Sequence, residues 1–494
     1  MLLSPALVPV CRRLGPVLEA ADFSERAVRA RVGDQTFGCL SRGEPGPVVA
    51  AAAGTDPLAV LIRLFLAAAP VSLVQVRAAL APVTVDEALD AGLLEADPDD
   101  PSAFRSALGL RPLDLPDGST QWFVSDLDGL MRPHPQHREH VLGVGHASQS
   151  LLRATPRARV GTVLDLGTGC GVHACGATRF ADAVIATDVS ERAAGFAAAS
   201  AALNGVRVDV RTGDWFAPVD GQRFDLILAN PPFVVGEGRI EHTYRDSGLD
   251  LDGASEVVVR SAPEHLTPGG TAALLASWVH RDGQPWQSRV ASWLPAEGVA
   301  AWVLQRDLAD PALYVGTWLR DEGLDPRIGA GRAKSDRWLR HLADAGVTGI
   351  GVGFVFLRAI DGPSEVVCEE LSHPFDDPLG AEVPDHFDRM AWLRNADFGT
   401  ARPVLAPDVA LERVSVAGAE GWDEVAVRVT RMSGPRWSHE IDSAGARLLA
   451  GCLGALCVDD LIELLEAATG DDGLRDPAHR LLADLYRHGF VTLL

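Results

Sequence analysis

Short apolar runs alternate with amphipathic stretches through the middle of the chain, from about residue 136 to 360. The runs are rich in Val, Ile, Leu and Ala and fit strands buried on both faces, and the stretches between them fit helices. This alternation predicts an α/β fold with a parallel, doubly wound, Rossmann-like sheet. The predicted strands are Thr162–Leu166, Ala183–Thr187, Val206–Arg211, Phe224–Ala229, Gly270–Ser277, Val299–Gln305 and Thr348–Leu357. The clearest helices are Glu191–Leu203, Ala254–His265 and Ala333–Ala345.

The region before this sheet, residues 1–135, mixes helices with short strands. Three short helices, the last capped by Thr84, precede strand-like segments at Phe104–Leu113 and Gln121–Ser125. Helices followed by a β-ribbon predict a winged-helix-like α+β domain, which could contribute to substrate recognition.

The region after the sheet, residues 361–494, is predicted to begin with a linker rich in Asp, Pro and Glu, from about Asp361 to His386. Further on, Asp442 is placed to cap one helix, and Asp476 followed by Pro477 to open another. A terminal strand at Phe490–Leu494 completes a second winged-helix-like domain. The chain is therefore predicted to hold three domains: 1–135, 136–360 and 361–494.

The charge of the chain limits its partners. Its formal net charge is −23, and Lys334 is its only lysine. An acidic surface repels phosphate backbones and anionic membranes, so a protein or peptide substrate is favoured over RNA or DNA. The apolar N-terminus is followed rather than preceded by arginines, unlike a signal peptide, and the seven scattered cysteines suit a reducing compartment. We expect a cytoplasmic protein that does not enter membranes, and the sequence leaves its oligomeric state open.

A glycine-rich turn follows the first strand of the sheet. It contains Gly167, Thr168, Gly169 and Gly171, with Asp165 two residues before the first glycine. Glycines allow a tight turn and the close approach of a ligand. A dinucleotide fingerprint would have Gly or Ala at position 172, which is Val here. An acid in the turn would repel a pyrophosphate but suits the ammonium group of a methionine moiety, so the motif favours S-adenosylmethionine over a nicotinamide.

Acidic residues also follow the next two strands. Asp188, about twenty residues after the turn, is placed to accept hydrogen bonds from both ribose hydroxyls of an adenosine. After the third strand, Asp214 could accept a hydrogen bond from the adenine amino group while Trp215 packs on the ring. Three such features on successive strands favour a cofactor site over an ordinary strand-to-helix turn.

The fourth strand runs directly into Asn230, Pro231, Pro232 and Phe233, at the edge of the sheet where such folds bind ligands. An amide or base NH2 is a poor nucleophile because its lone pair is delocalised. If the Asn230 side-chain oxygen and the Pro231 carbonyl each accept one N–H, the nitrogen is fixed and its lone pair can face a sulfonium methyl. Pro232 stiffens the loop, and Phe233 offers a flat surface for a planar group. Asn230 could also touch the cofactor.

With these motifs the chain resembles class I methyltransferases of the small-domain group over about residues 140–360. It is similar to release-factor glutamine methyltransferases and to enzymes that methylate guanine N2 in ribosomal RNA, and its architecture resembles an actinobacterial group of methyltransferases. The resemblance implies a seven-stranded sheet and S-adenosylmethionine as cofactor. It implies that Asp165 and the glycines line the methionine end, that Asp188 and Asp214 hold ribose and adenine, and that Asn230 and Pro231 position the acceptor nitrogen.

Several readings of the function remain open. N-methylation of a protein glutamine or similar amide is favoured by the acidic surface. Methylation of an exocyclic nitrogen in RNA or DNA is supported by the flanking winged-helix-like regions and by Phe233, and a cofactor-binding module without turnover is a more distant reading. In the loop after the catalytic motif, Tyr244 and Arg245 are candidate substrate contacts. No spacing of Cys and His indicates a metal site.

Overall fold

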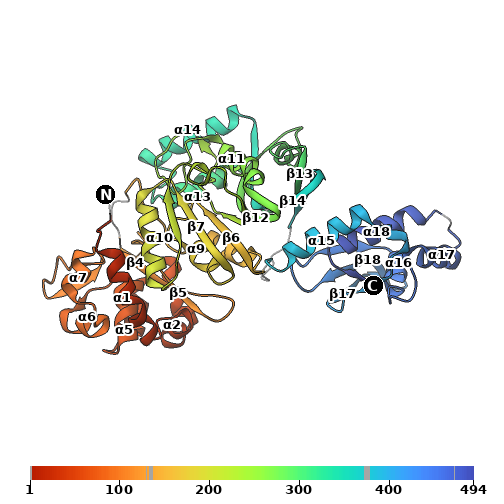
Figure 1. Cartoon of the computed structure of the whole chain (residues 1–494). Helices are drawn as coiled ribbons and strands as arrows, with labels where there is room; N and C mark the ends of the chain where they lie inside the picture. Colours follow the sequence, from red (N-terminus) through yellow and green to blue (C-terminus); the bar gives the residue numbers. More distant parts are fainter. Residues whose placement is uncertain (1–2, 130, 133–136, 372–378, 472) are drawn as a thin grey trace. The chain divides into compact units, whose positions relative to one another are not determined.

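The computed structural model describes residues 3–129, 131–132, 137–371, 379–471 and 473–494. The chain forms two compact units (Figure 1). The first contains residues 1–152 and 158–370, and the second contains residues 153–157 and 371–494. The expected boundary at residue 136 and part of the expected linker, residues 372–378, lie outside the described residues.

The N-terminal part of the first unit is mainly helical. Its helices are α1 (Leu7–Ala20), α2 (Glu25–Val32), α3 (Asp34–Phe37), α4 (Pro45–Ala51), α5 (Pro57–Leu61), α6 (Leu73–Leu80) and α7 (Val85–Asp90). Its strands are β1 (Val71–Ser72), β2 (Leu94–Ala96), β3 (Ala103–Ser106), β4 (Leu108–Asp114) and β5 (Thr120–Asp126). The first three form a small sheet in the order β1-β3-β2, and β4 pairs with β5. Thr84 caps α7 through a reciprocal bond with Glu87, so that prediction is confirmed.

This helical part shares one hydrophobic core with the central sheet's helix α10 (Glu191–Leu203). Helix α1 crosses α10 so closely that a Cβ on Gly15 would lie 2.0 Å from the Leu203 carbonyl oxygen. Only glycine permits this approach, because any larger residue at position 15 would push α1 away from α10.

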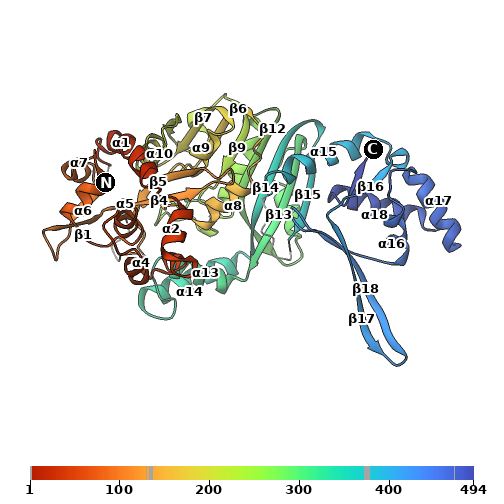
Figure 2. The same ribbon diagram turned by 90° about the horizontal axis from the view of Figure 1, so that it is seen from below.

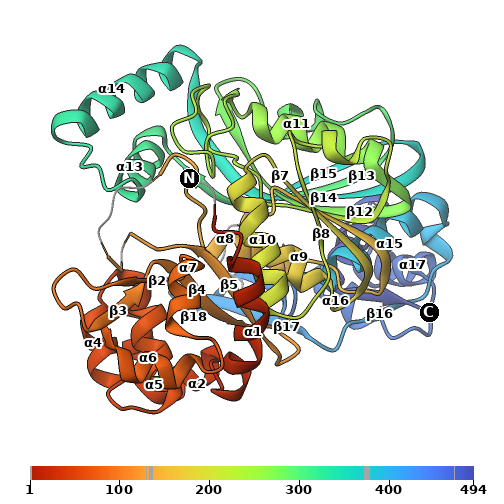
Figure 3. The same ribbon diagram turned by 60° about the vertical axis from the view of Figure 1, so that its left-hand side comes forward.

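The central sheet has the strand order β15-β13-β14-β12-β9-β6-β7-β8. Strands β8, β7, β6, β9 and β12 are parallel, and β14 is antiparallel to both of its neighbours. Strands β12, β13, β14 and β15 are labelled together in Figure 3. The ranges are β6 (Val160–Leu166), β7 (Ala181–Asp188), β8 (Asp209–Thr212), β9 (Phe224–Ala229), β12 (Leu266–Arg281), β13 (Glu297–Ala309), β14 (Val347–Pro363) and β15 (Glu365–Glu370). All seven predicted strands are present, and the predicted α/β class is confirmed. The sheet was expected to be parallel, but it is so only in part, because β14 is antiparallel to both of its neighbours.

The eighth strand, β15, lies in the segment that was predicted to be a linker, so that prediction is wrong for residues 365–370. The chain turns at Ser364, whose N–H donates to the Ala296 carbonyl at 2.9 Å and whose Oγ accepts from Val299 N at 3.1 Å. This turn crosses the start of β13 and lets β15 pair with it in parallel. An edge strand is only partly buried and therefore tolerates acidic residues, such as those around Val366 and Val367. The sequence of β15 consequently lacks the continuous apolar run that would indicate a strand.

The remaining helices of this unit connect the strands. They are α8 (His146–Ala154), α9 (Val172–Ala177), α10, α11 (Gly253–Ser261), α12 (Trp286–Ala291), α13 (Pro311–Asp321) and α14 (Gly329–Asp344). A small hairpin of β10 (Gly236–Glu237) and β11 (Asp250–Leu251) follows β9. Helices α13 and α14 both lie between β13 and β14 in the chain, and they pack on each other.

The second unit is built around short sheets and four helices. Its helices are α15 (Glu382–Asn395), α16 (Ser443–Ala450), α17 (Val458–Thr469) and α18 (Arg475–Arg487). Its strands are β16 (Pro403–Leu405), β17 (Val409–Gly418), β18 (Gly421–Arg431), β19 (Ser438–Ile441) and β20 (Val491–Leu493). The hairpin of β17 and β18 projects from this unit (Figure 2). Asp442 caps α16 as predicted, but α18 begins at Arg475, one residue before Asp476.

Candidate active site

The glycine turn connects β6 to α9. Gly167, Gly169 and Gly171 have φ values of +72°, +56° and +87°, which side chains rarely adopt. A Cβ on Gly171 would also lie 3.1 Å from the Ala197 Cα on α10. The N–H groups of Gly167 and Thr168 both donate to the Thr187 carbonyl at 2.9 Å, so the turn is tied to the end of β7. The glycines of the motif are thus required by the backbone itself.

Asp188, at the end of β7, faces this turn. Its Oδ2 accepts from Gly169 N and its Oδ1 from Ser190 N, both at 2.9 Å. Burial raises the pKa of the Asp188 carboxyl above its usual range, against the lowering effect of the two N–H donors. Because each carboxylate oxygen has a second lone pair, the fixed group can still accept one further hydrogen bond per oxygen.

The loop after β8 joins the same edge. Gly213 N donates to the Asp188 carbonyl at 2.9 Å, which brings the end of β8 next to the end of β7. Asp214 is exposed, and Trp215 is half-buried against the core of the sheet. Trp215 has a φ of +44°, which is strained for a bulky residue. Strained backbone conformations of this kind cluster at ligand-binding and active sites.

The Asn-Pro-Pro-Phe loop lies directly beside the glycine turn. A Cβ built on Gly167 would lie 3.7 Å from the Pro231 Cα, an ordinary van der Waals contact. Within the described residues, neither the Asn230 side-chain amide nor the Pro231 carbonyl has a hydrogen-bond partner. Two acceptors are therefore free beside the turn. Pro231 is buried, whereas Asn230, Pro232 and Phe233 are half-buried.

Three side chains from distant parts of the sequence hold the far end of this loop. Ser277 Oγ on β12 donates to the Phe233 carbonyl. Val235 N donates to Tyr314 Oη on α13 at 2.9 Å, and Trp338 Nε1 on α14 donates to the Val235 carbonyl at 3.1 Å. Sequence reasoning missed all three positioning residues, because nothing local to Ser277, Tyr314 or Trp338 marks them.

The two candidate substrate contacts in the following loop have different environments. The Arg245 side chain is 2% exposed and its guanidinium forms an ion pair with Glu322, so the expectation that it touches substrate is wrong. Tyr244 Oη donates to Asp321 at 3.2 Å. The Arg245 carbonyl accepts from Val234 N at 3.3 Å, which makes this loop a further support for the Asn-Pro-Pro-Phe segment.

Two basic side chains around this support, Lys334 and Arg337, are already paired. Lys334 donates to Glu322 at 2.7 Å and also bonds Glu241, and Arg337 donates to Glu237 at 2.9 Å. These pairs balance the positive charges of Lys334 and Arg337. A polyanion would therefore find weak electrostatic attraction there.

Asp165, the acid of the glycine motif, lies beneath the turn and is fully buried. Its Oδ2 accepts from Thr168 Oγ1 at 2.7 Å and from Ala174 N at 2.9 Å. Its Oδ1 has no hydrogen bond and lies 3.7 Å from His173 Nδ1. Burial raises the pKa of Asp165, and the neighbouring His173 opposes that rise.

These residues fit S-adenosylmethionine. The space beside Gly169 is open, with no atom within 4 Å of a Cβ built there, so a ligand can reach the backbone of the turn. The hydroxyl of Thr187 is buried without a partner at the same edge. Asp188 would hold ribose hydroxyls, and Asp214 and Trp215 would face the adenine.

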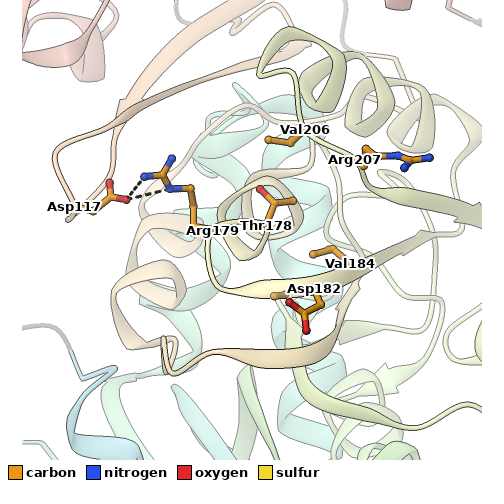
Figure 4. Close-up of a pocket in the computed structure, with 8 residues that line it drawn as sticks. Asp117, Thr178, Arg179, Asp182, Val184, Val206 and Arg207 are labelled. Carbon is orange, nitrogen blue, oxygen red and sulfur yellow. Dashed lines mark hydrogen bonds and ion pairs between the residues drawn. The ribbon is translucent and has the colours of Figure 1, made fainter.

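A separate surface pocket lies at the other end of β7. It is lined by Asp117, Thr178, Arg179, Ala181, Asp182, Val184, Val206 and Arg207 (Figure 4). Arg179 donates to Asp117 at 2.6 Å, which neutralises its charge. None of the predicted site residues lines this pocket.

Among the described residues, no group of three or more His, Cys, Asp or Glu side chains is arranged so that it could hold a metal ion. None of the described helices is long and apolar enough to cross a membrane.

The strand order, the glycine turn and the acids after β7 and β8 define a class I methyltransferase domain that uses S-adenosylmethionine. Comparison with protein families agrees: residues 142–281 match the methyltransferase small domain. Residues 20–105 and 384–493 match two domains of unknown function, DUF7059 and DUF7782.

Curated relatives resemble the same part of the chain. The release factor glutamine methyltransferase of Cereibacter sphaeroides is 39% identical over 141 residues, which cover 26% of this chain and 50% of that protein. The ribosomal protein uL3 glutamine methyltransferase of Bradyrhizobium diazoefficiens is 34% identical over 186 residues, covering 34% of this chain and 57% of that protein. The ribosomal RNA small subunit methyltransferase C of Salmonella arizonae is 35% identical over 137 residues, 27% of this chain and 36% of that protein. The chain thus spans about half the length of the two glutamine methyltransferases.

Proposed function

We propose that this protein transfers the methyl group of S-adenosylmethionine to a planar NH2 nitrogen. The observation that carries the proposal is the nearness of the glycine turn to the Asn-Pro-Pro-Phe loop: a Cβ built on Gly167 would lie 3.7 Å from the Pro231 Cα. A cofactor on the turn and an acceptor at the loop would therefore be neighbours.

In this proposal the chain's own residues orient the acceptor. Asn230 Oδ1 and the Pro231 carbonyl each accept one N–H of the NH2 group, and the two prolines keep these acceptors fixed before the substrate arrives. The cofactor supplies an electrophilic methyl group on a sulfonium. As the nitrogen–carbon bond forms, the carbon–sulfur bond would break and leave a neutral thioether. The N–H protons become more acidic in this step, so the two acceptors bind them more strongly in the transition state than in the ground state, and one proton is then lost to solvent. Phe233 contributes a flat surface for the planar group.

We infer that the substrate is a protein glutamine or a similar amide. The paired charges around Lys334 and Arg337 and the net charge of −23 disfavour a polyanion. Two of the three relatives described above are named for glutamine methylation.

Methylation of an exocyclic base nitrogen is the second candidate. One observation favours it: helices α6 and α7 together with the small sheet β1-β3-β2 follow the order of a winged-helix unit, a fold often used to bind nucleic acid. The second unit, with α16, α17 and α18 before β20, is proposed to be winged-helix-like as well. A cofactor-binding module without turnover is the remaining alternative, and the two free acceptors of the loop count against it.

One experiment separates these functions. Purified protein is incubated with a cell extract and methyl-labelled S-adenosylmethionine, and the labelled product is then treated with protease or with nuclease. Label released by protease supports the amide substrate, and label released by nuclease supports the base substrate. Binding of the cofactor without any macromolecular label would overturn the enzymatic proposal.

A further inference from the structure

The hairpin of β17 and β18 extends away from the rest of the second unit (Figure 2). Strand β19 pairs with β18 only at Val427–Thr430, so the end of the hairpin, residues 414–426, consists of two strands alone. None of these residues, all of which the structure describes, is buried. A two-stranded ribbon exposed on both faces is at best marginally stable in water. The end of the hairpin would therefore gain stability from a partner that covers it.

The end of the hairpin exposes apolar side chains on both faces. Trp422 pairs with Ala417 and is 77% exposed. Val416 pairs with Asp423, and it is 48% exposed. Successive residues of a strand point to opposite faces, so Trp422 and Val416 lie on different faces of the ribbon. The surface that fits this end is a cleft that encloses it rather than a flat patch.

A tryptophan at the end of a projecting element is suited to anchor an interface. Trp422 lies next to the turn that joins the two strands, where it can be buried by a partner without any change in the fold of the chain. Tryptophan is enriched among the few residues that dominate the energy of protein–protein interfaces. Trp422 is therefore the candidate anchor.

The charges around this anchor are not balanced. The two arginines nearest the turn are each paired with a glutamate of the other strand, Arg413 with Glu424 at 2.8 Å and Arg428 with Glu412 at 3.4 Å. Glu420 and Asp423 are exposed on either side of Trp422 in the sequence, and neither has an ion-pair partner among the described residues. A Cβ built on Gly418 would lie 2.0 Å from Asp423 Oδ2, so a glycine at this position leaves room for the carboxylate over the turn.

The two unpaired carboxylates determine which partner fits. A second copy of the chain carries the same net charge of −23, and nucleic acids and anionic membranes are negative as well. Each of these would be repelled from Glu420 and Asp423. A positively charged protein surface is attracted, because opposite potentials across an interface favour association.

We propose that the β17–β18 hairpin is a docking arm for a different, basic protein. Trp422 enters an apolar cleft of that protein, and Glu420 and Asp423 face arginines or lysines at the rim of the cleft. The proposal is independent of methyl transfer, since none of these residues belongs to the candidate active site.

A photo-reactive group at the turn identifies the partner and the surface that it uses. p-Benzoylphenylalanine replaces Ala419, an exposed residue of the turn, in the full chain produced in its own cells. After irradiation, cross-linked peptides are located by mass spectrometry. The expected product joins the turn to a segment of another protein that is rich in arginine or lysine. A cross-link to the same chain, to a second copy, to nucleic acid or to lipid would overturn the proposal, as would no cross-link at all.

The anchor is then tested with the purified partner and the full chain by calorimetry. Trp422→Ala should bind at least about thirtyfold more weakly, as expected for an interface anchor. Leu464→Ala is the control, because this apolar residue of α17 is also exposed, at 57%, but lies outside the hairpin. It should bind like the native chain. Equal affinities of Trp422→Ala and the native chain would overturn the proposal.

The role of charge is tested with a variant of nearly unchanged shape. Glu420→Gln combined with Asp423→Asn should weaken binding by about fivefold at low salt, because exposed charge pairs contribute modestly. Its affinity should also fall less with added salt than that of the native chain. The unfolding temperature should match that of the native chain, since both side chains are exposed. An unchanged salt dependence would overturn the choice of a basic partner.

Discussion

Gly167 and Pro231 lie next to each other at the carboxyl edge of the sheet, so that a Cβ built on Gly167 would lie 3.7 Å from the Pro231 Cα. Gly167 follows β6 and Pro231 follows β9, and these strands are hydrogen-bonded neighbours although α9, β7, α10 and β8 separate them in the chain. The glycine turn and the Asn-Pro-Pro-Phe loop therefore form two walls of one site, the turn being the first wall and the loop the second.

Replacing the acceptor side chain tests the second wall. Asn230→Ala should lower methyl transfer by about 100-fold or more while cofactor affinity stays within twofold, because the lost hydrogen bond is made to the reacting nitrogen. Label transfer to the extract and calorimetry with S-adenosylmethionine measure the two effects. Asn395→Ala is the matched control, since among the described residues its amide bonds only the Ala391 carbonyl of its own helix in the second unit. Full activity in Asn230→Ala would show that the catalytic assignment is wrong.

Adding one methyl group to the turn tests the first wall. Gly171→Ala combines φ +87° with a Cβ at 3.1 Å from the Ala197 Cα, so it should weaken cofactor binding and lower the free energy of unfolding by more than about 2 kcal/mol. Gly205→Ala shares the positive φ, +64°, but its Cβ would meet no atom within 4 Å. That control should lose only about 1–2 kcal/mol and keep cofactor affinity. If Gly171→Ala and Gly205→Ala lost equal amounts of stability and of cofactor affinity, the close contact with α10 would be unimportant.

Acidification should weaken cofactor binding through Asp188. Burial raises the pKa of this carboxyl, and its protonated form loses acceptor capacity for ribose hydroxyls. The sign is therefore a loss of affinity as the pH falls, beginning above the pH range of an ordinary aspartate. Calorimetry at a series of acidic pH values should show this loss in the native chain and not in Asp188→Asn, which binds weakly throughout. An acid limb that persists in Asp188→Asn would assign the effect to another group.

The support of the loop can be weakened without touching its acceptors. Tyr314→Phe removes the oxygen that accepts from Val235 N, and a buried N–H without a partner costs about 1–3 kcal/mol. We expect a lower unfolding temperature and a slower methyl transfer, with cofactor affinity unchanged. Tyr486→Phe in the second unit is the control, because no hydrogen bond of its hydroxyl is found among the described residues. An unaltered rate in Tyr314→Phe would limit the role of α13 to stability.

Salt distinguishes the two substrate classes once the product is known. A nucleic-acid substrate held by several phosphate contacts should lose binding steeply, by about a thousandfold or more between 50 and 200 mM salt. The paired charges of Lys334 and Arg337 predict a much smaller change, measured as kcat/KM against salt concentration. A steep decline would favour the base substrate.

The sequence by itself determined seven of the eight strands of the central sheet and the motif residues. Buried parallel strands read as continuous apolar runs, and the positive φ of Gly167, Gly169 and Gly171 excludes most other residues, so both leave local marks. Local caps were equally legible at Thr84 and Asp442. The prediction that Asp476 caps α18 was wrong, because the helix begins at Arg475. Pro477 did not fix the start of the helix, since proline fits any position of a first helical turn, where no N–H is needed.

Only the tertiary structure decided what surrounds those motifs. Strand β15 exists through its pairing with β13, and Ser277, Tyr314 and Trp338 reach the Asn-Pro-Pro-Phe loop from elements up to 103 positions away in the sequence. The same holds for the surroundings of Asp165, whose carboxylate is buried and accepts hydrogen bonds from Thr168 and Ala174. Long-range contacts of this kind depend on how strands and helices pack, and no local pattern of residues records that packing.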